Sequence, residues 1–468
     1  MFIDGQWMNG DSVQVTDKYT GDVLGTLAEA TPSQVDAAIN AADVSFRERP
    51  LSSFERYEIL LKMSAWIRRH ESELIQLLIA EVGKTYKDTK VEVDRAYHTY
   101  LLSAEEAKRI GGEVLPLSSI PGAESKTGFA ARFPKGVIGA ITPFNYPFLL
   151  ASHKIAPAIA SGNTIVIKPA PNTPFSTVRM VQGLHECGLP EGHVQVIQGG
   201  PGAGDALLAN PKIQMYTFTG SARIGQYIKE HSGLRPVVLE LGNSSPNIVC
   251  NDADLHLAAL RCGARAFTAA GQACISVQRI LVQDGCWDAF LPKFLNVVTN
   301  LKVGNPYQPD TDVGPMISER EAIRAEQWVA EAVNAGAQVL CGNERNGAFF
   351  QPTVLVNAPI DSKVCREEVF APVAVLIPFK DIDEAIAIAN DTPYGLHAGL
   401  FTQSMPNIMK AWRELVYGGV IVNDTSTFRS DLAPYGGLKN SGLGKEGPRY
   451  AIESMTHLKV LVIDEAQL

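Results

Sequence analysis

Apolar and polar residues follow two different repeats along the chain, and the repeat changes near residue 136. In the N-terminal part, apolar positions recur every three to four residues, which is the period of a helix with one buried face. The pattern predicts helices at 33–46, 53–70, 71–82 and 88–108. Thr31 and Pro32 precede the first of these as a cap and a first-turn proline.

Beyond residue 136, short apolar runs alternate with helical segments. The first strand-like runs lie at 136–141, 164–167, 194–197 and 215–218. A second group has strands near 247–249, 279–282, 374–379 and 419–423, with helices at 255–270 and 287–299. Apolar strands that alternate with helices are typical of parallel sheets covered on both faces. The pattern therefore predicts an α/β protein with doubly wound sheets.

Composition narrows the class of protein. A chain of 468 residues is long enough for two or three domains, and 46% hydrophobic with 19% charged residues is ordinary for a globular protein. The net charge of −9 argues against a nucleic acid or an anionic membrane as the main partner. Seven cysteines without a C-x-x-C motif suit a reducing compartment.

The sequence carries no signal for export or for membrane insertion. The N-terminus lacks a basic start followed by an apolar run, so we expect no secretory signal. No apolar stretch reaches the roughly 18 residues that a spanning helix needs. These features predict a cytoplasmic protein.

Cys274 is the strongest candidate for chemistry in the chain. It lies in the segment AAGQACIS at 269–276, where small neighbours would let a substrate approach the sulfur. Glu240 ends an apolar run about thirty residues earlier and is a candidate general base. Taken alone, a cysteine such as Cys274 is more commonly a buried structural residue, and a glutamate such as Glu240 is usually solvated.

Further segments, in a fixed order, favour the catalytic interpretation. They are TPFNYP at 142–147, KP at 168–169, FTGS at 218–221, ELGN at 240–243, GQAC at 271–274, EEVFAP at 367–372 and PYGGLKNSG at 434–442. Together these motifs resemble the aldehyde dehydrogenase superfamily over nearly the whole chain. ELGN combined with QACISVQR looks most similar to the lactaldehyde and non-phosphorylating glyceraldehyde-3-phosphate dehydrogenases.

The resemblance implies a fold with two doubly wound α/β domains and a small β oligomerisation arm. Residues 1–115 and 135–242 would form the NAD(P)-binding domain, and 243–445 the catalytic domain. Residues 116–134 and 446–468 would form the arm, whose apolar segments 126–133 and 458–463 read as edge strands. A bare apolar edge invites aggregation, so a homodimer or homotetramer is expected.

The resemblance also assigns catalytic roles. Cys274 would be the nucleophile and Asn145 a donor to the oxyanion. Glu240 would activate the water that releases the acid. Lys154 and Glu446 match a proton-relay pair, although an ion pair with a purely structural role is equally compatible with the sequence.

The implied cofactor is NAD or NADP. Its binding residues would be Ile141, Thr142, Phe144, Lys168, Pro171, Thr219, Gly220, Ser221, Gly225, Leu241, Glu368 and Phe370. Lys168 would bond the adenosine ribose, and the start of the helix after Phe218 would face the pyrophosphate. Three residues after the lysine, where NAD-preferring members often carry Glu, this chain has Pro171. Without a carboxylate there, NADP is admitted and can be preferred.

Gly199–Gly204 partly matches a dinucleotide fingerprint after a strand, and it is the weaker candidate for the phosphate site.

The substrate residues implied by the resemblance are Tyr146, Leu150, His153, Ile275 and Arg429. A histidine that faces the substrate tunnel and an arginine near its mouth suggest a small polar or anionic aldehyde. A surface arginine and a histidine behind the pocket wall are the alternatives.

No cysteine or histidine spacing matches a zinc site, so no metal is expected.

Other functions remain compatible with the sequence. A CoA-acylating dehydrogenase would resolve the thioester with a thiol in place of water, but Glu240 as a base favours hydrolysis. A non-catalytic protein that keeps the fold is disfavoured by Cys274, Glu240 and Asn145 occurring together. A simple hydrolase could use the same cysteine and glutamate.

Overall fold

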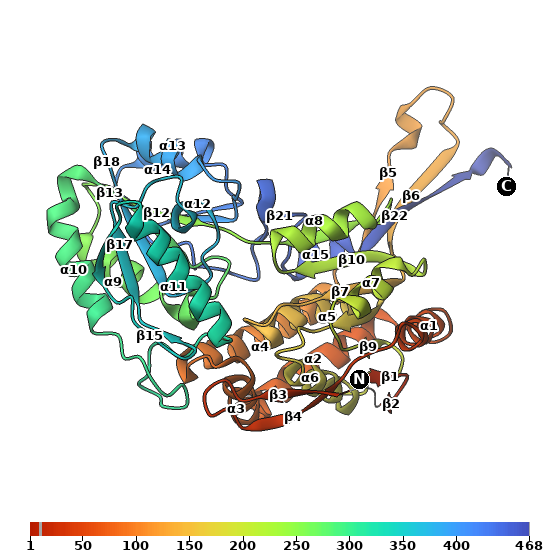
Figure 1. Cartoon of the computed structure of the whole chain (residues 1–468). Helices are drawn as coiled ribbons and strands as arrows, with labels where there is room; N and C mark the ends of the chain where they lie inside the picture. Colours follow the sequence, from red (N-terminus) through yellow and green to blue (C-terminus); the bar gives the residue numbers. More distant parts are fainter. Residues whose placement is uncertain (9–11, 468) are drawn as a thin grey trace.

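Figure 1 shows the computed structural model, which describes residues 1–8 and 12–467. Two α/β bodies lie side by side, and a narrow β arm projects from one of them. The first body contains most of the N-terminal half of the chain, and the second most of the C-terminal half. The α/β class predicted from the apolar pattern is confirmed.

The first body is built on an eight-stranded sheet with the order β2-β1-β9-β8-β7-β10-β11-β21. In that order the strands span Gln6–Trp7, Phe2–Ile3, Val194–Val196, Thr164–Lys168, Val137–Ile141, Ile213–Thr219, Val237–Glu240 and Gly442–Leu443. The five central strands run parallel, and the strands at both ends are antiparallel to their neighbours.

Helices cover both faces of this sheet, because successive residues of a strand point to opposite faces. Ile138 packs with one set of helices and Val137 with the other, and both are fully buried. The first set contains α2 (Ser53–Arg69), α3 (Glu71–Val82), α4 (Tyr86–Ala107), α5 (Pro147–Ala160) and α6 (Phe175–Glu186). The second contains α1 (Pro32–Glu48), α7 (Pro201–Ala209) and α8 (Ala222–His231).

The second body has a seven-stranded sheet with the order β14-β17-β18-β13-β12-β19-β20. These strands span Gln338–Cys341, Thr353–Val356, Val373–Phe379, Val277–Gln283, Ser245–Val249, His397–Phe401 and Gly419–Val422. Its helices are α9 (Leu255–Arg265), α10 (Trp287–Thr299), α11 (Glu319–Asn334), α12 (Lys363–Arg366), α13 (Ile382–Asn390) and α14 (Met405–Glu414).

The arm is a three-stranded antiparallel sheet with the order β22-β6-β5. β5 is Gly112–Leu115, β6 is Lys126–Pro134 and β22 is Thr456–Asp464. Its side chains Val114, Phe129 and Val460 are exposed. The helix α15 (Pro448–Ser454), just before β22, packs on α5 and adds Ile452 to the core of the first body. The domain limits and the role of the arm in oligomerisation stay predictions.

Smaller elements complete the fold. They are the hairpins β3 (Ser12–Thr16) with β4 (Val23–Ala28) and β15 (Arg345–Asn346) with β16 (Phe349–Phe350), and the 3₁₀ turns η1 (Leu117–Ser119), η2 (Thr268–Gly271), η3 (Asp284–Cys286), η4 (Lys439–Ser441) and η5 (Glu465–Gln467).

The helix expected at 255–270 is wrong at its C-terminal end, because α9 stops at Arg265. Ala269, Ala270 and Gly271 adopt left-handed backbone angles, with φ of 52°, 53° and 70°. The backbone N–H of Ala269 donates to Asp88 Oδ2 at 2.9 Å, so α4 holds this turn in place. The chain therefore reverses just before Cys274 and does not continue as a helix.

We predict that Gly271→Ala destabilises the protein by roughly 2 kcal/mol or more. A Cβ at this position would lie 2.0 Å from the carbonyl oxygen of Ala371, and the positive φ adds strain. Chemical denaturation measures the loss. Gly304→Ala is the matched control, because its Cβ would meet no atom within 4 Å among the described residues and its φ is not in the left-handed range. Equal stability of the two variants would contradict the prediction.

Candidate active site

The carboxyl ends of four parallel strands meet at one edge of the first sheet. Ile141 pairs with Lys168 across β7 and β8, and with Phe218 of β10 on the other side. Thr219 pairs in turn with Glu240, the last residue of β11. Ligands of open α/β sheets bind at this edge, so four predicted site residues stand where the fold places a ligand.

A pocket of about 260 Å³ lies between the two bodies and contains Cys274. Of the predicted site residues, Asn145, Tyr146, Leu150, Cys274, Ile275 and Arg429 line it. The sequence analysis missed several further lining residues, among them Arg95, Arg265 and Tyr435. The helical pattern gives Arg95 and Arg265 no mark that distinguishes them from surface charges. Tyr435 stands inside a recognised motif and could have been found there.

The thiol of Cys274 lies 3.2 Å from the hydroxyl of Tyr435. Burial raises the pKa of Cys274 to about 11, and the carboxyl groups of Glu368 and Glu240 act in the same direction. The hydrogen bond with Tyr435 and the charge of Arg429 oppose this rise. In this state the cysteine holds its proton near neutral pH, so attack on a carbonyl needs help from its surroundings.

Asn145 is buried beside the cysteine loop, and its Nδ2 donates to the carbonyl oxygen of Gln272 at 2.8 Å. This bond uses one of the two amide hydrogens and leaves the second for an oxygen in the pocket. The side chain of Gln272 is itself fixed, because it donates to Ala269 and accepts from the backbone of Ile317. The amide therefore has the position and the spare hydrogen that an oxyanion donor needs.

Glu240 is buried, and neither of its carboxyl oxygens has a hydrogen-bond partner in the part of the chain that the structure describes. Gly436 approaches so closely that a Cβ there would lie 2.7 Å from Glu240 Oε1. Burial is the larger cause that raises the pKa of Glu240 well above its usual range, and the negative charge of Glu446 is the next. A carboxyl group with a raised pKa and no fixed partner suits general acid–base chemistry.

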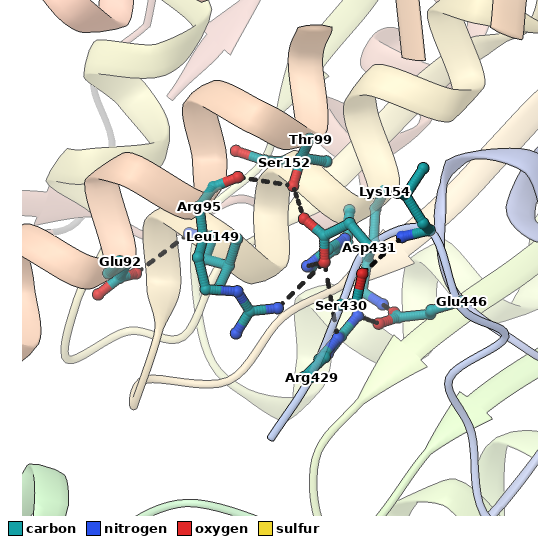
Figure 2. A network of polar contacts seen from close by, with 12 residues as sticks. Glu92, Arg95, Thr99, Leu149, Ser152, Lys154, Arg429, Ser430, Asp431 and Glu446 are labelled. Carbon is teal, nitrogen blue, oxygen red and sulfur yellow. Dashed lines mark hydrogen bonds and ion pairs between the residues drawn. The ribbon is translucent and has the colours of Figure 1, made fainter. Parts of the chain in front are cut away.

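The predicted pair Lys154 and Glu446 is a buried ion pair, with 2.9 Å between Nζ and Oε1 (Figure 2). Lys154 also donates to Thr219 Oγ1 at 2.8 Å, at the end of β10. Arg429 donates to Glu446 Oε2 at 3.1 Å. Burial alone would raise the pKa of Glu446, but Lys154 and Arg429 lower it to about 2. Glu446 is therefore ionised near neutral pH.

Asp431 joins two of the pocket arginines, Arg95 and Arg429 (Figure 2). It accepts from Arg95 Nη2 at 3.0 Å and from Thr99 Oγ1 at 2.8 Å, both on α4. Arg429 Nε lies 3.8 Å away. Sequence reasoning missed Asp431, since its partners on α4 are more than 300 residues away and no local pattern connects them.

The structure buries the side chains of both His153 and Arg429. Arg429 is 5% exposed, so it is a buried wall residue and not a surface arginine. His153 is 1% exposed and lies behind the pocket, with Nε2 at 3.6 Å from Asp431 Oδ1. Neither ring nitrogen has a hydrogen bond within the described residues. Burial and the charge of Arg429 lower the pKa of His153 to about 3, so the ring is neutral.

The predicted cofactor residues form a second group at the strand edge. Lys168 is buried and donates to the carbonyl oxygen of Gly199 at 3.2 Å, and burial lowers its pKa to about 8. Ser221 begins α8 without a side-chain cap among the described residues, and the hydroxyl of Thr142 is buried there without a partner. A buried lysine, an uncapped helix start and an unpaired hydroxyl fit a phosphate-bearing nucleotide.

The remaining cofactor candidates lie around these groups. Glu368 accepts from the backbone of Asn243 at 3.1 Å, and burial raises its pKa to about 7. Phe370, with a φ of 50°, meets the ring of Phe144 edge-on at 5.8 Å. Contacts of these residues with a cofactor stay predictions.

Two glycines and a proline complete the predicted cofactor set. A Cβ at Gly225 would lie 2.4 Å from the side chain of Leu241, so this glycine lets α8 pack on Leu241. Gly220 donates to the carbonyl oxygen of Glu240 at 3.0 Å. Pro171 is half-buried just beyond β8. Its effect on the choice between NAD and NADP stays a prediction.

Two further observations concern the described residues 1–8 and 12–467. None of their helices has the length and apolar character needed to cross a membrane. No group of three or more His, Cys, Asp or Glu side chains among them could hold a metal ion.

Comparison with known proteins decides the family. A model of the aldehyde dehydrogenase family matches residues 7–461. The chain belongs to this family. The aldehyde dehydrogenase fold and the enzyme class expected from the motifs are thereby confirmed.

Three relatives of this aldehyde dehydrogenase are informative. A 3-sulfolactaldehyde dehydrogenase of Priestia aryabhattai is 45% identical over 466 residues, which cover 99% of this chain and 98% of that protein. Aldehyde dehydrogenase 21 of Physcomitrella patens, in complex with the reaction product succinate, superposes with a TM-score of 0.96 at 37% identity, covering 99% of this chain and 98% of that one. Glyceraldehyde-3-phosphate dehydrogenase of Methanocaldococcus jannaschii, complexed with NADP, has a TM-score of 0.93 at 37% identity, covering 98% and 100%.

The buried neutral histidine of this aldehyde dehydrogenase gives a prediction about acid stability. His153 has a pKa of about 3 when folded and about 6.5 when unfolded, so the unfolded chain takes up the proton first. Stability is therefore lost as the pH falls from about 6.5 toward 3, at up to about 1.4 kcal/mol per pH unit from this group. Its charged neighbours are Arg429, Asp431, Glu446 and Arg95.

In His153→Leu this loss is absent, and we expect a shallower fall of the unfolding free energy between pH 6 and 4. Denaturant titrations at several pH values measure the slope. His256→Leu, at an exposed position, is the control that removes a surface histidine. An unchanged slope in His153→Leu would show that the ring takes up its proton in the folded protein.

Proposed function

We propose that this aldehyde dehydrogenase oxidises a small anionic aldehyde to the carboxylic acid, with NAD or NADP as the oxidant. The observation that carries the proposal is the presence of three arginines, Arg95, Arg265 and Arg429, in the wall of the pocket that holds Cys274. Guanidinium groups bind carboxylate, sulfonate and phosphate through charge-assisted hydrogen bonds. Relatives named for sulfolactaldehyde and glyceraldehyde-3-phosphate, and one solved with succinate, support an anionic substrate.

In the first half of the reaction, the Cys274 thiolate attacks the aldehyde carbon and forms a thiohemiacetal. The developing oxyanion accepts hydrogen bonds from Asn145 Nδ2 and from the backbone N–H of Cys274. When bound, NAD(P) supplies the hydride acceptor that this oxidation requires. Lys168, Thr219, Ser221 and Glu368 would hold it at the strand edge.

In the second half, Glu240 takes a proton from water, and the water attacks the thioester on Cys274. The carboxyl group has no competing partner among the described residues, so it can turn toward that water. Glu446 and Lys154 link the interior to Thr219 and would pass the proton onward. Because Glu240 can activate water to hydrolyse the thioester, we favour a free acid over a CoA thioester as the product.

We propose that the enzyme accepts both NAD and NADP as the cofactor. Pro171 provides no carboxylate to bond the ribose 2′-hydroxyl or to repel a 2′-phosphate, and Lys168 carries a positive charge close by in the sequence. Assays of the same aldehyde with NAD and with NADP compare kcat/KM directly.

The roles of Cys274 and Glu240 are separable by experiment. Cys274→Ala should abolish dehydrogenase turnover. Glu240→Gln should still give one burst of NAD(P)H, because acylation does not strictly need the base, and should then stall as an acyl-enzyme that mass spectrometry detects on Cys274. Normal turnover in Cys274→Ala would refute the mechanism, and full steady turnover in Glu240→Gln would remove Glu240 from hydrolysis. Added CoA leaves turnover unchanged if water is the acceptor.

Substrate charge is tested with a matched pair of aldehydes, succinic semialdehyde and uncharged butanal. In Arg265→Met and in Arg95→Met, kcat/KM for succinic semialdehyde should fall roughly tenfold to a hundredfold, and the value for butanal should change little. Arg320→Met is the control, because Arg320 is 87% exposed on the surface. An equal fall for both aldehydes in the pocket variants would contradict an anion site.

A further inference from the structure

Tyr435 is the residue whose side chain reaches the sulfur of Cys274, and the mechanism above does not use it. Its hydroxyl oxygen lies 3.2 Å from Sγ, and the side chain is buried. Among the described residues, this sulfur is the hydrogen-bond partner of the hydroxyl. A buried phenol whose hydrogen-bond partner is a thiol can stabilise a charge that develops on the sulfur.

The position of Tyr435 is fixed at the backbone. Its N–H donates to the carbonyl oxygen of Glu446 at 3.0 Å, and its carbonyl oxygen accepts from the N–H of Glu446 at 2.6 Å. This isolated bridge joins Tyr435 to the carboxylate that Lys154 and Arg429 hold. The phenol therefore has little freedom to leave the sulfur.

The ring is fixed as well. The guanidinium carbon of Arg429 lies 3.6 Å from the ring centroid, a cation–π contact. The ring of His397 also meets it nearly edge-on, with centroids 5.0 Å apart. A phenylalanine at this position would keep both ring contacts and lose only the hydroxyl, so the hydroxyl is the part of the side chain that needs an explanation.

We propose that Tyr435 is a catalytic residue whose phenol donates a hydrogen bond to Cys274 and stabilises its thiolate. In the neutral thiol, either atom of the pair can be the donor. Once the thiol has lost its proton, sulfur is only an acceptor, and the phenol O–H turns toward it. Hydrogen bonds to ionised acceptors are stronger than those between neutral groups, so the contact favours the ionised form.

The other groups around Cys274 make this donor necessary. Glu240 at the end of β11 and Glu368 after α12 both disfavour a second negative charge, as does burial of the sulfur. Arg429 favours the thiolate, but it is shared with Glu446. Tyr146, at the N-terminus of α5, also lines the pocket. Tyr435 is the neighbour with a hydrogen bond to the sulfur.

The test is the pH profile of alkylation of Cys274 by iodoacetamide in the full-length enzyme without cofactor, with the modified Cys274 peptide quantified by mass spectrometry. In Tyr435→Phe we expect the midpoint to rise by about one pH unit, and therefore a roughly tenfold slower reaction on the rising limb. Tyr216→Phe is the control: Tyr216 is buried in β10 and donates to the carbonyl oxygen of Leu208 on α7 at 2.7 Å. Its midpoint should equal that of the parent.

A second measurement separates thiolate stabilisation from a change of shape. The burst of NAD(P)H in Tyr435→Phe should slow at neutral pH and recover as the pH is raised, because alkali supplies the thiolate. A misplaced cysteine would stay slow at every pH. An unchanged alkylation midpoint, or a burst that alkali does not restore, overturns the proposal.

This inference rests on the proposed role of Cys274 as the nucleophile, and the two can fail separately. If Cys274→Ala keeps its dehydrogenase turnover, the proposed function fails. If Cys274→Ala is inactive while Tyr435→Phe has the parent profile, only the role of Tyr435 fails.

Discussion

The buried ion pair between Lys154 and Glu446 is the interaction on which the rest of the site depends. Lys154 comes from α5, whose first turn follows Asn145, and it also bonds Thr219 at the end of β10. Glu446 pairs through its backbone with Tyr435 and through its second oxygen with Arg429. Removal of one partner from a buried ion pair destabilises a protein by about 3–5 kcal/mol. The pair therefore helps to hold α5, the end of β10 and the segment around Glu446 together, in addition to their packing.

The same ion pair gives two buried carboxyl groups, those of Glu446 and Glu240, different pKa values. Glu446 has two cationic partners, and they hold its pKa far below that of an ordinary buried carboxyl group. Glu240 has no hydrogen-bond partner within the described part of the chain, and burial beside a charged neighbour raises its pKa. Two carboxyl groups whose pKa values are pushed apart can divide acid–base work, one fixed as an anion and the other able to take and give a proton.

The features that the sequence predicts correctly are the ones that local pattern controls. The apolar runs at 164–167 and 215–218 correspond to β8 and β10, and the motif residues at their ends do meet at one edge. The end of α9 could not be predicted, because the left-handed turn at Ala269 is imposed by Asp88 of a distant helix and by the close approach of Gly271 to Ala371. The ion pair of Arg95 and Asp431 could not be predicted for the same reason, because it forms only when α4 packs beside the loop that follows β20.

The charge balance of the interior supports the anionic substrate that we propose. Arg95, Arg429 and Lys154 contribute three positive charges to the connected network, and Asp431 and Glu446 contribute two negative ones. His153 is neutral, and Glu240 makes no hydrogen bond to this network within the described residues, so neither enters the balance. One positive charge is left over, and a partly buried charge without an ion-pair partner is costly. An anion that enters the pocket beside Arg95 and Arg429 relieves that cost, while an uncharged aldehyde does not.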